Sequence, residues 1–141
     1  MTNSVSYSYE NNVATIAMDD GKANALSSDI IAHLNAAFDK AEADDAIVVL
    51  TGRDGVFSGG FNLKEMQKGQ AEALFLTSKG SKLARRILAF PKPVIALASG
   101  HSIAMGAFLL LACDYRMIAQ GDFKVGLNET LIGMTMHNFG I

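Results

Sequence analysis

The sequence predicts an α/β domain built from parallel βαβ units. Short apolar runs rich in β-branched residues recur along the chain, helical periodicities separate them, and glycine-bearing turns follow the strands. The chain has 141 residues, of which 50% are hydrophobic and 18% are charged, so we expect a single domain with a hydrophobic core. Helices that join parallel strands are expected to make right-handed crossovers.

The N-terminal third predicts a hairpin followed by a helix. Residues 5–9 alternate between polar and β-prone side chains, the run 13–18 is β-prone throughout, and two asparagines at 11–12 separate them. Such a pair between two strands is typical of a tight hairpin turn. Apolar residues then recur at helical spacing up to Glu42, and Ser27 or Ser28 is the expected N-cap.

The middle of the chain predicts one buried strand and two helices. The unbroken run Ala46–Thr51 is typical of a strand buried on both faces, and the glycine-rich segment after it is interpreted as a loop. A short helix is expected within 61–66. A longer amphipathic helix is expected from about residue 72 to residue 88, ahead of Pro91.

The last third predicts a second buried strand over 93–98, which Gly100 ends. Ser102 is the expected cap of a helix that runs to Ala112. Two short strands are expected at 115–119 and 123–125.

Charge and hydropathy exclude several classes of protein. Twelve basic and fourteen acidic residues are scattered without a long run of one sign, so no nucleic-acid partner is expected. The N-terminus lacks the pattern of a signal peptide, and the apolar stretch 103–113 is about half of the roughly 20 residues that a membrane span needs. The lone Cys113 excludes a disulfide within the chain. We therefore expect a cytoplasmic protein with no membrane partner.

The histidines and serines do not indicate a metal site or a covalent hydrolase. His33, His101 and His137 have no second ligand three or four residues away, so no metal is expected. No G-x-S-x-G nucleophile elbow occurs.

Two segments have the same layout, in which a buried strand enters a glycine-bearing turn and a helix begins just beyond it. The first covers 48–64 and the second 94–106. Unpaired amides at helix starts suit an anion, and two of them that converge on one carbonyl oxygen would form an oxyanion hole. Alternatively, both turns are ordinary loops of an α/β sheet.

Glu129 is the candidate catalytic carboxylate. It lies in the nearly uncharged segment 125–133, next to Leu127, Leu131 and Ile132. Partial removal from water would suit it for proton transfer. The alternative is a structural carboxylate at a helix start, paired with the helix dipole, Asn128 or a neighbouring cation.

Together, the segments 57–66, 91–100 and 112–116, with Gly106 between the last two, resemble the enoyl-CoA hydratase/isomerase (crotonase) family in order and spacing. The resemblance covers nearly the whole chain. It implies the ClpP/crotonase-like α/β fold of stacked ββα units, with 1–141 as its N-terminal core and a C-terminal helical trimerisation region outside this sequence. It also implies a homotrimer or hexamer at full length.

The resemblance further implies roles for individual residues. The backbone amides of Phe61 and Met105 match the two oxyanion-hole positions. Coenzyme A is expected as part of an acyl-CoA thioester substrate and not as a separate cofactor. The residues expected to contact it are Lys22, Ala23, Ala25, Gly60, Phe61, Asn62, Leu63, Lys64, Met105 and Gly106.

The sequence departs from the hydratase pattern at one catalytic position. Hydratases of this family hold water between two glutamates, and here Phe108 stands at the first position while Glu129 stands at the second. One carboxylate suffices to move a proton, so we expect Δ3,Δ2-enoyl-CoA isomerisation. The alternatives are hydration, another crotonase reaction, or a non-catalytic acyl-CoA-binding subunit.

Overall fold

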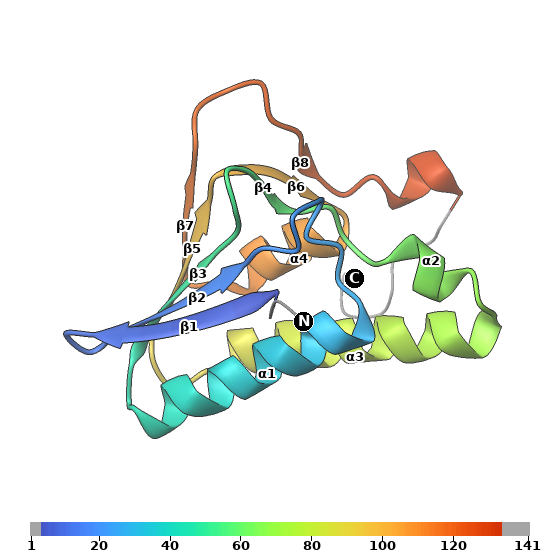
Figure 1. Cartoon of the computed structure of the whole chain (residues 1–141). Helices are drawn as coiled ribbons and strands as arrows, with labels where there is room; N and C mark the ends of the chain where they lie inside the picture. Colours follow the sequence, from blue (N-terminus) through green and yellow to red (C-terminus); the bar gives the residue numbers. More distant parts are fainter. Residues whose placement is uncertain (1–3, 134–141) are drawn as a thin grey trace.

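The computed structural model describes residues 4–133, whose strands form two sheets (Figure 1). The larger sheet has the order β1-β2-β3-β5-β7 and the smaller has the order β4-β6-β8. The strands are β1 (Val5–Glu10), β2 (Val13–Met18), β3 (Ile47–Thr51), β4 (Gly55–Ser58), β5 (Val94–Ala98), β6 (Gly100–Ile103), β7 (Tyr115–Ile118) and β8 (Val125–Gly126). The helices are α1 (Ser28–Ala43), α2 (Leu63–Met66), α3 (Gln70–Leu88), α4 (Met105–Ala112) and the 3-10 helix η1 (Glu129–Ile132).

The predicted hairpin and first helix are confirmed. β1 and β2 pair in antiparallel register, and Asn11 and Asn12 have φ angles of 51° and 63°, which a tight hairpin turn requires of both central residues. Ser27 caps α1, because its side-chain oxygen accepts a hydrogen bond from the amide of Ile30 at 3.2 Å.

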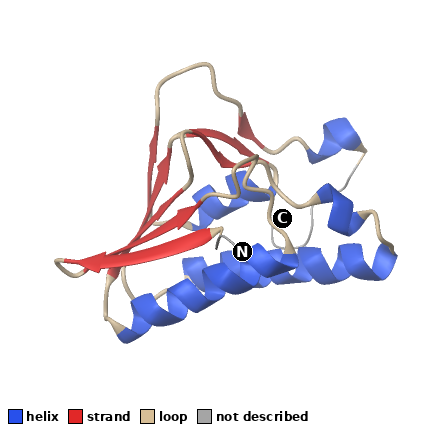
Figure 2. Cartoon of the chain, in the orientation of Figure 1, coloured by secondary structure: helices blue, strands red, loops and turns tan. Residues whose placement is uncertain are grey.

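The predicted parallel arrangement is also confirmed. Each of the pairs β2–β3, β3–β5 and β5–β7 is parallel, and every connection between them contains a helix. Alternate strand residues such as Ile16, Leu50 and Ala96 are fully buried against the helices. Helices α1 and α3 run side by side along one side of the sheets (Figure 2).

Four elements, β4, β6, α4 and β8, correct the prediction. The segment interpreted as a loop after β3 contains β4, and the residue expected to cap a helix, Ser102, is instead a buried residue of β6. Gly100 explains why β4 and β6 can pair, since a Cβ atom there would stand 2.0 Å from the carbonyl carbon of Gly55. Helix α4 begins at Met105, after Ala104, and not at the predicted serine. β8 begins two residues later than expected.

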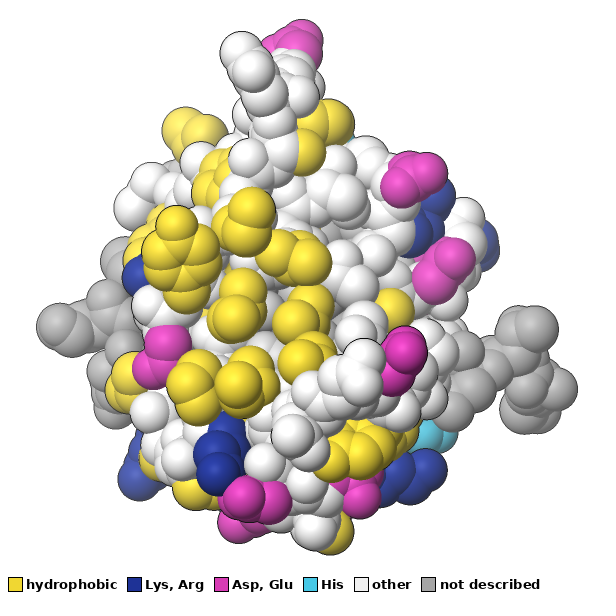
Figure 3. All heavy atoms as spheres, turned by 90° about the vertical axis from the view of Figure 1, so that its left-hand side faces the viewer, with side chains coloured by type: hydrophobic (Ala, Val, Ile, Leu, Met, Phe, Trp, Pro, Cys, Tyr) yellow, Lys and Arg dark blue, Asp and Glu magenta, His cyan; other side chains and the backbone are white. Residues whose placement is uncertain are grey.

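The outer face of the five-stranded sheet is apolar and uncovered within residues 4–133. Its outward side chains include Ile47, Leu97, Tyr115 and Met117, each at least 36% exposed. Hydrophobic side chains gather on the side of the molecule that Figure 3 shows. Within residues 4–133, no helix is both long enough and apolar enough to cross a lipid bilayer.

Candidate active site

A cavity of about 510 Å³ opens beside the ends of β2, β4 and β6. Five segments contribute to it: the loop after β2, the turn after β4 with α2, the helix α3, the end of β6 with α4, and the segment at η1. The lining residues are Asp20, Lys22, Ala23, Ala25, Gly59, Phe61, Asn62, Leu63, Lys64, Met66, Thr77, Ile103, Ala104, Phe108, Asn128 and Glu129.

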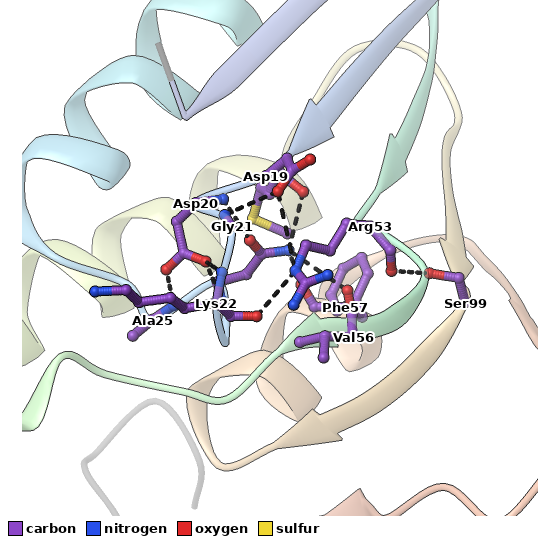
Figure 4. A network of polar contacts seen from close by, with 12 residues as sticks. Asp19, Asp20, Gly21, Lys22, Ala25, Arg53, Val56, Phe57 and Ser99 are labelled. Atoms are coloured by element: carbon purple, nitrogen blue, oxygen red, sulfur yellow. Dashed lines mark hydrogen bonds and ion pairs between the residues drawn. The ribbon is translucent and has the colours of Figure 1, made fainter. Parts of the chain in front are cut away.

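The loop after β2 is held by its own backbone amides (Figure 4). One carboxylate oxygen of Asp20 accepts hydrogen bonds from the amides of Lys22 at 2.7 Å and Asn24 at 2.8 Å. Its other oxygen accepts from the amide of Ala25 at 3.2 Å. The carboxylate of Asp20 therefore has a structural role, because both of its oxygens accept hydrogen bonds from the loop, although the residue lines the cavity.

Arg53, which lies between β3 and β4, also holds the loop after β2. Its Nε donates to the carbonyl oxygen of Lys22 at 2.9 Å and lies 3.9 Å from the carboxylate of Asp19. The backbone of Arg53 is itself anchored, because its carbonyl accepts a hydrogen bond from the hydroxyl of Ser99 (Figure 4). These contacts thus hold the backbone around Lys22 in place.

Buried polar groups tie this loop to the turn after β4. The side-chain amide of Asn24 is buried and donates to the carbonyls of Met18 at 2.9 Å and Phe57 at 3.1 Å. The hydroxyl of Ser58 donates to the carbonyl of Asn24 at 2.9 Å and accepts from the amide of Gly60 at 3.2 Å. These bonds place the loop after β2 against the residues that follow β4.

Glu65 links α2 to the start of α1. Its carboxylate accepts hydrogen bonds from the amide of Ser28 at 2.9 Å and from the hydroxyl of the same residue. Burial by itself raises the pKa of Glu65, but these two bonds and the charges of Lys68 and Lys79 outweigh burial and hold the pKa below its ordinary value. The ionised carboxylate therefore helps to fix the segment that carries Phe61.

The two glycine-bearing turns predicted from the sequence meet. A Cβ atom on Gly60 would stand 3.0 Å from the Cβ of Ala104 and 3.4 Å from the amide nitrogen of Met105. A Cβ atom on Gly106 would stand 2.4 Å from the carbonyl oxygen of Ser58. The backbones of the two turns are therefore in direct contact.

Each turn leaves one amide without a partner among the described residues. The bridge between Leu26 and Phe61 uses the carbonyl of Gly60 and the amide of Asn62, so the N–H of Phe61 points away from Leu26. Met105 is the first residue of α4, where amides have no partner within the helix. Two free N–H groups thus belong to turns that touch.

The backbone of Ala104 sets where α4 begins. Ala104 has φ of 51° and ψ of −122°, a region that residues with a Cβ atom rarely adopt. Its amide donates to the carbonyl of Gly126 at 3.0 Å, and its carbonyl accepts from the amides of Ala107 and Phe108. β8 and α4 together hold this strained residue in place.

Glu129 brings a carboxylate to the cavity without an internal partner. The residue is 9% exposed, and its Oε2 has no hydrogen-bond partner among the described residues; nor does the Oδ1 of Asn128 beside it. Phe108, from α4, is buried and lines the same cavity. Among the described residues, the cavity is therefore lined by one carboxylate without a hydrogen-bond partner and by a phenyl ring.

Most of the residues predicted to contact substrate line this one cavity: Lys22, Ala23, Ala25, Phe61, Asn62, Leu63, Lys64 and Glu129. Gly60, Met105 and Gly106 are buried and lie outside the lining, next to Ala104. The sequence analysis missed Thr77, Ile103 and Ala104, and no local pattern could have identified them, because only tertiary packing brings them to the cavity.

Two lysines give the cavity its positive charge. Neither Lys22 nor Lys64 forms an ion pair within residues 4–133, whereas Arg86, on the far part of α3, is paired with Asp39 at 2.6 Å and Glu42 at 3.5 Å. The two lysines are thus available to an anionic ligand.

The described cysteine and histidines, Cys113, His33 and His101, are not part of the cavity lining. Burial raises the pKa of the Cys113 thiol to about 12, so this residue is a poor nucleophile. His101 accepts a hydrogen bond from the amide of Lys124, and His33 lies 3.7 Å from Asp29. No group of potential metal ligands gathers within the described residues, and His137 lies outside them.

A model of the family described as enoyl-CoA hydratase/isomerase matches residues 8–141. The chain is 35% identical over 136 residues to a probable enoyl-CoA hydratase of Bacillus subtilis, a match that covers 94% of this chain and 52% of that protein. The chain spans about half the length of the curated relatives it matches.

Solved structures agree with the fold. An enoyl-CoA hydratase/isomerase family protein from Pseudomonas syringae superposes with a TM-score of 0.96 at 50% identity, over 99% of this chain and 60% of that one. A Mycobacterium tuberculosis protein, described as an enoyl-CoA isomerase in one structure and as a probable enoyl-CoA hydratase in another, gives in the first a TM-score of 0.90 at 46% identity, over 96% of this chain and 59% of that one.

Proposed function

Because the chain belongs to the enoyl-CoA hydratase/isomerase (crotonase) family, we propose that the complete protein binds an acyl-CoA thioester in the cavity and isomerises a 3-enoyl-CoA to the 2-enoyl-CoA. One observation carries the choice of reaction. The described cavity lining contains two carboxylates, Asp20 and Glu129, and only that of Glu129 is not hydrogen-bonded to backbone amides of the protein. At the position where a second catalytic carboxylate is expected in a hydratase, this chain has Phe108.

The proposed reaction needs one base. Glu129 takes a proton from C2 of the substrate, and the electrons of that C–H bond spread over a dienolate whose negative oxygen accepts hydrogen bonds from the amides of Phe61 and Met105. Glu129 then returns the proton to C4. The double bond moves from position 3 to position 2, and no water, oxidant or second base is consumed.

The proposed coenzyme A path follows the oriented loop. The pantetheine and adenine would run along the backbone of Lys22–Ala25 and of Phe61–Lys64, both of which line the cavity. Lys22 and Lys64, which lack ion-pair partners in the described structure, would contact phosphate oxygens. The hydrogen bonds of Asp20 and Arg53 support this path, because they hold the backbone of the loop along the cavity.

The test is Glu129→Gln in the complete protein, with a 3-enoyl-CoA as substrate and absorbance of the conjugated product as the readout. Isomerisation should fall by about 100-fold or more, since glutamine keeps the shape but cannot carry the proton. Asp122→Asn, an exposed change in the same part of the chain, should retain activity. Full activity of Glu129→Gln would overturn the proposed mechanism.

Hydration is the second candidate, because the Bacillus subtilis relative is described as a probable hydratase. Loss of absorbance from a 2-enoyl-CoA in water, faster than isomerisation of the 3-enoyl-CoA, would favour it. A non-catalytic acyl-CoA-binding subunit is a third candidate, which the presence of Phe108 in the lining of the same cavity as Glu129 favours. Calorimetric binding of acyl-CoA without turnover of either enoyl-CoA would support that role.

A further inference from the structure

Gly80 lies in the interior of α3, is buried, and meets the side chains of both Phe61 and Met105. We infer that Gly80 is a positioning residue for the thioester site: its missing side chain lets the Phe61 ring pack against α3 and thereby sets the direction of the Phe61 amide. The inference rests on the proposed function, because this amide is one of the two that would bind the thioester oxygen.

The space at Gly80 is already filled by the two neighbours. A Cβ atom there would stand 2.5 Å from Cε1 and Cζ of Phe61 and 3.4 Å from Cε of Met105. Carbon atoms in good contact lie about 3.5–4.0 Å apart, so the Phe61 ring would have to move by about 1 Å. The contact with Met105 is tolerable by comparison.

The ring of Phe61 cannot move that far without affecting the site. The carbonyl of Gly60 and the amide of Asn62, on either side of Phe61, are bonded to Leu26 at 2.7 Å and 2.9 Å. Gly60 is also packed against Ala104. A displaced ring must therefore turn into the cavity, which it lines, or twist the Phe61 amide between its two fixed neighbours.

The backbone gives no other reason for a glycine at this position. Gly80 is not among the residues with positive φ, and glycine is an unfavourable residue in a helix interior. Alanine would strengthen α3 if only the helix mattered. The lack of space for a Cβ atom beside Phe61 is therefore the structural reason for a glycine at position 80.

The experiment compares four forms of the complete protein with wild type: Gly80→Ala, Phe61→Leu, the double variant, and Ser78→Ala as a control on the exposed side of α3. Octanoyl-CoA is the probe, since it carries a thioester carbonyl but has no double bond to move. Free coenzyme A, which lacks that carbonyl, is the matched ligand. Calorimetry gives both affinities, and the isomerase assay gives kcat.

Gly80→Ala should weaken octanoyl-CoA binding about five- to tenfold, the value of roughly one hydrogen bond, and leave binding of coenzyme A unchanged. Its kcat should fall about 100-fold, as expected for a reacting group misplaced by about 1 Å. Phe61→Leu should restore both quantities in the double variant, because it removes ring atoms while keeping the amide. Ser78→Ala should match wild type. If Gly80→Ala also lowers the melting temperature, we expect the double variant to return it to the wild-type value.

Wild-type affinity and kcat for Gly80→Ala would overturn the inference. So would equal weakening of octanoyl-CoA and coenzyme A, or a loss that Phe61→Leu does not relieve. Absence of isomerase activity in the wild type would contradict the proposed reaction but not the role of Gly80, because the two binding measurements do not depend on turnover.

Discussion

Gly60 packs closely against Ala104: a Cβ atom on Gly60 would stand 3.0 Å from the Cβ of Ala104, so a methyl group there would have to push the neighbouring turn away by a few tenths of an ångström. This contact joins segments more than forty residues apart and brings the amide of Met105 close to the residue that precedes Phe61. The pair of free amides depends on it.

Gly60→Ala should therefore be strongly destabilising. Its φ of +91° is unfavourable for alanine, and the methyl group would press on Ala104 and on the carbonyl of Ile103. Together we expect a loss of about 2–5 kcal/mol in the free energy of unfolding, measured in urea. Gly55→Ala is the matched control, since its φ is +77° with nothing within 4 Å, and it should lose only about 1–2 kcal/mol. Equal losses would show that the contact with Ala104 does not matter.

Ala104→Gly should have the opposite effect on stability. Glycine adopts φ of 51° and ψ of −122° without strain, so the free energy of unfolding should rise by about 1 kcal/mol. Ala107→Gly, in the first turn of α4, makes the same chemical change where the backbone is helical, and should instead cost about 1 kcal/mol. Chemical denaturation of both variants tests the sign. A loss of stability in Ala104→Gly would mean that the positive φ stores no strain.

Phe108→Glu should introduce hydration of a 2-enoyl-CoA in the complete protein. The new carboxylate would lie in the same cavity as Glu129 and supply the second proton-transfer group that a phenyl ring cannot. Phe108→Gln is the control of equal size without a transferable proton, and the glutamate variant should exceed its hydration rate by about 100-fold. Both variants should unfold more easily, because they place a polar group where Phe108 is buried. Equal hydration rates in the two would contradict the assignment of this position.

The bond between Ser28 and Glu65 should make stability depend on pH. The pKa of Glu65 is lower in the folded protein than its ordinary value of 4.5, so the ionised carboxylate stabilises the fold at neutral pH. That contribution is lost as the pH falls below 4.5 and through the lowered value. Glu65→Gln should cost about 1 kcal/mol at pH 7, since partial exposure keeps the effect small, and the cost should shrink towards zero in acid.

Urea unfolding at several pH values measures this dependence. Glu10→Gln is the control, because Glu10 is exposed at the end of β1 and makes no side-chain hydrogen bond within the described residues. A cost of Glu65→Gln that does not change between pH 7 and acid would argue against the ionised bond to Ser28.

Local sequence patterns predicted the elements that depend on neighbouring residues. The asparagine pair set the hairpin, Ser27 set the start of α1, and the β-branched runs set β3 and β5, because turns, caps and buried strands each need particular residues at fixed spacing. The four-residue strands β4 and β6 were missed, since each is stabilised by a partner about forty-five residues away and not by its own sequence.

The same division applies to the candidate site. Short segments of the sequence were enough to predict the family, the two glycine-bearing turns and Glu129 as the candidate carboxylate, because those features are local. The folded structure was needed to show that Gly60 packs against Ala104, that Thr77 lines the cavity and that Gly80 packs against Phe61. The helical periodicity of the sequence predicts which side of α3 is buried. It does not predict which residues pack against that side, because this depends on how distant segments of the chain come together.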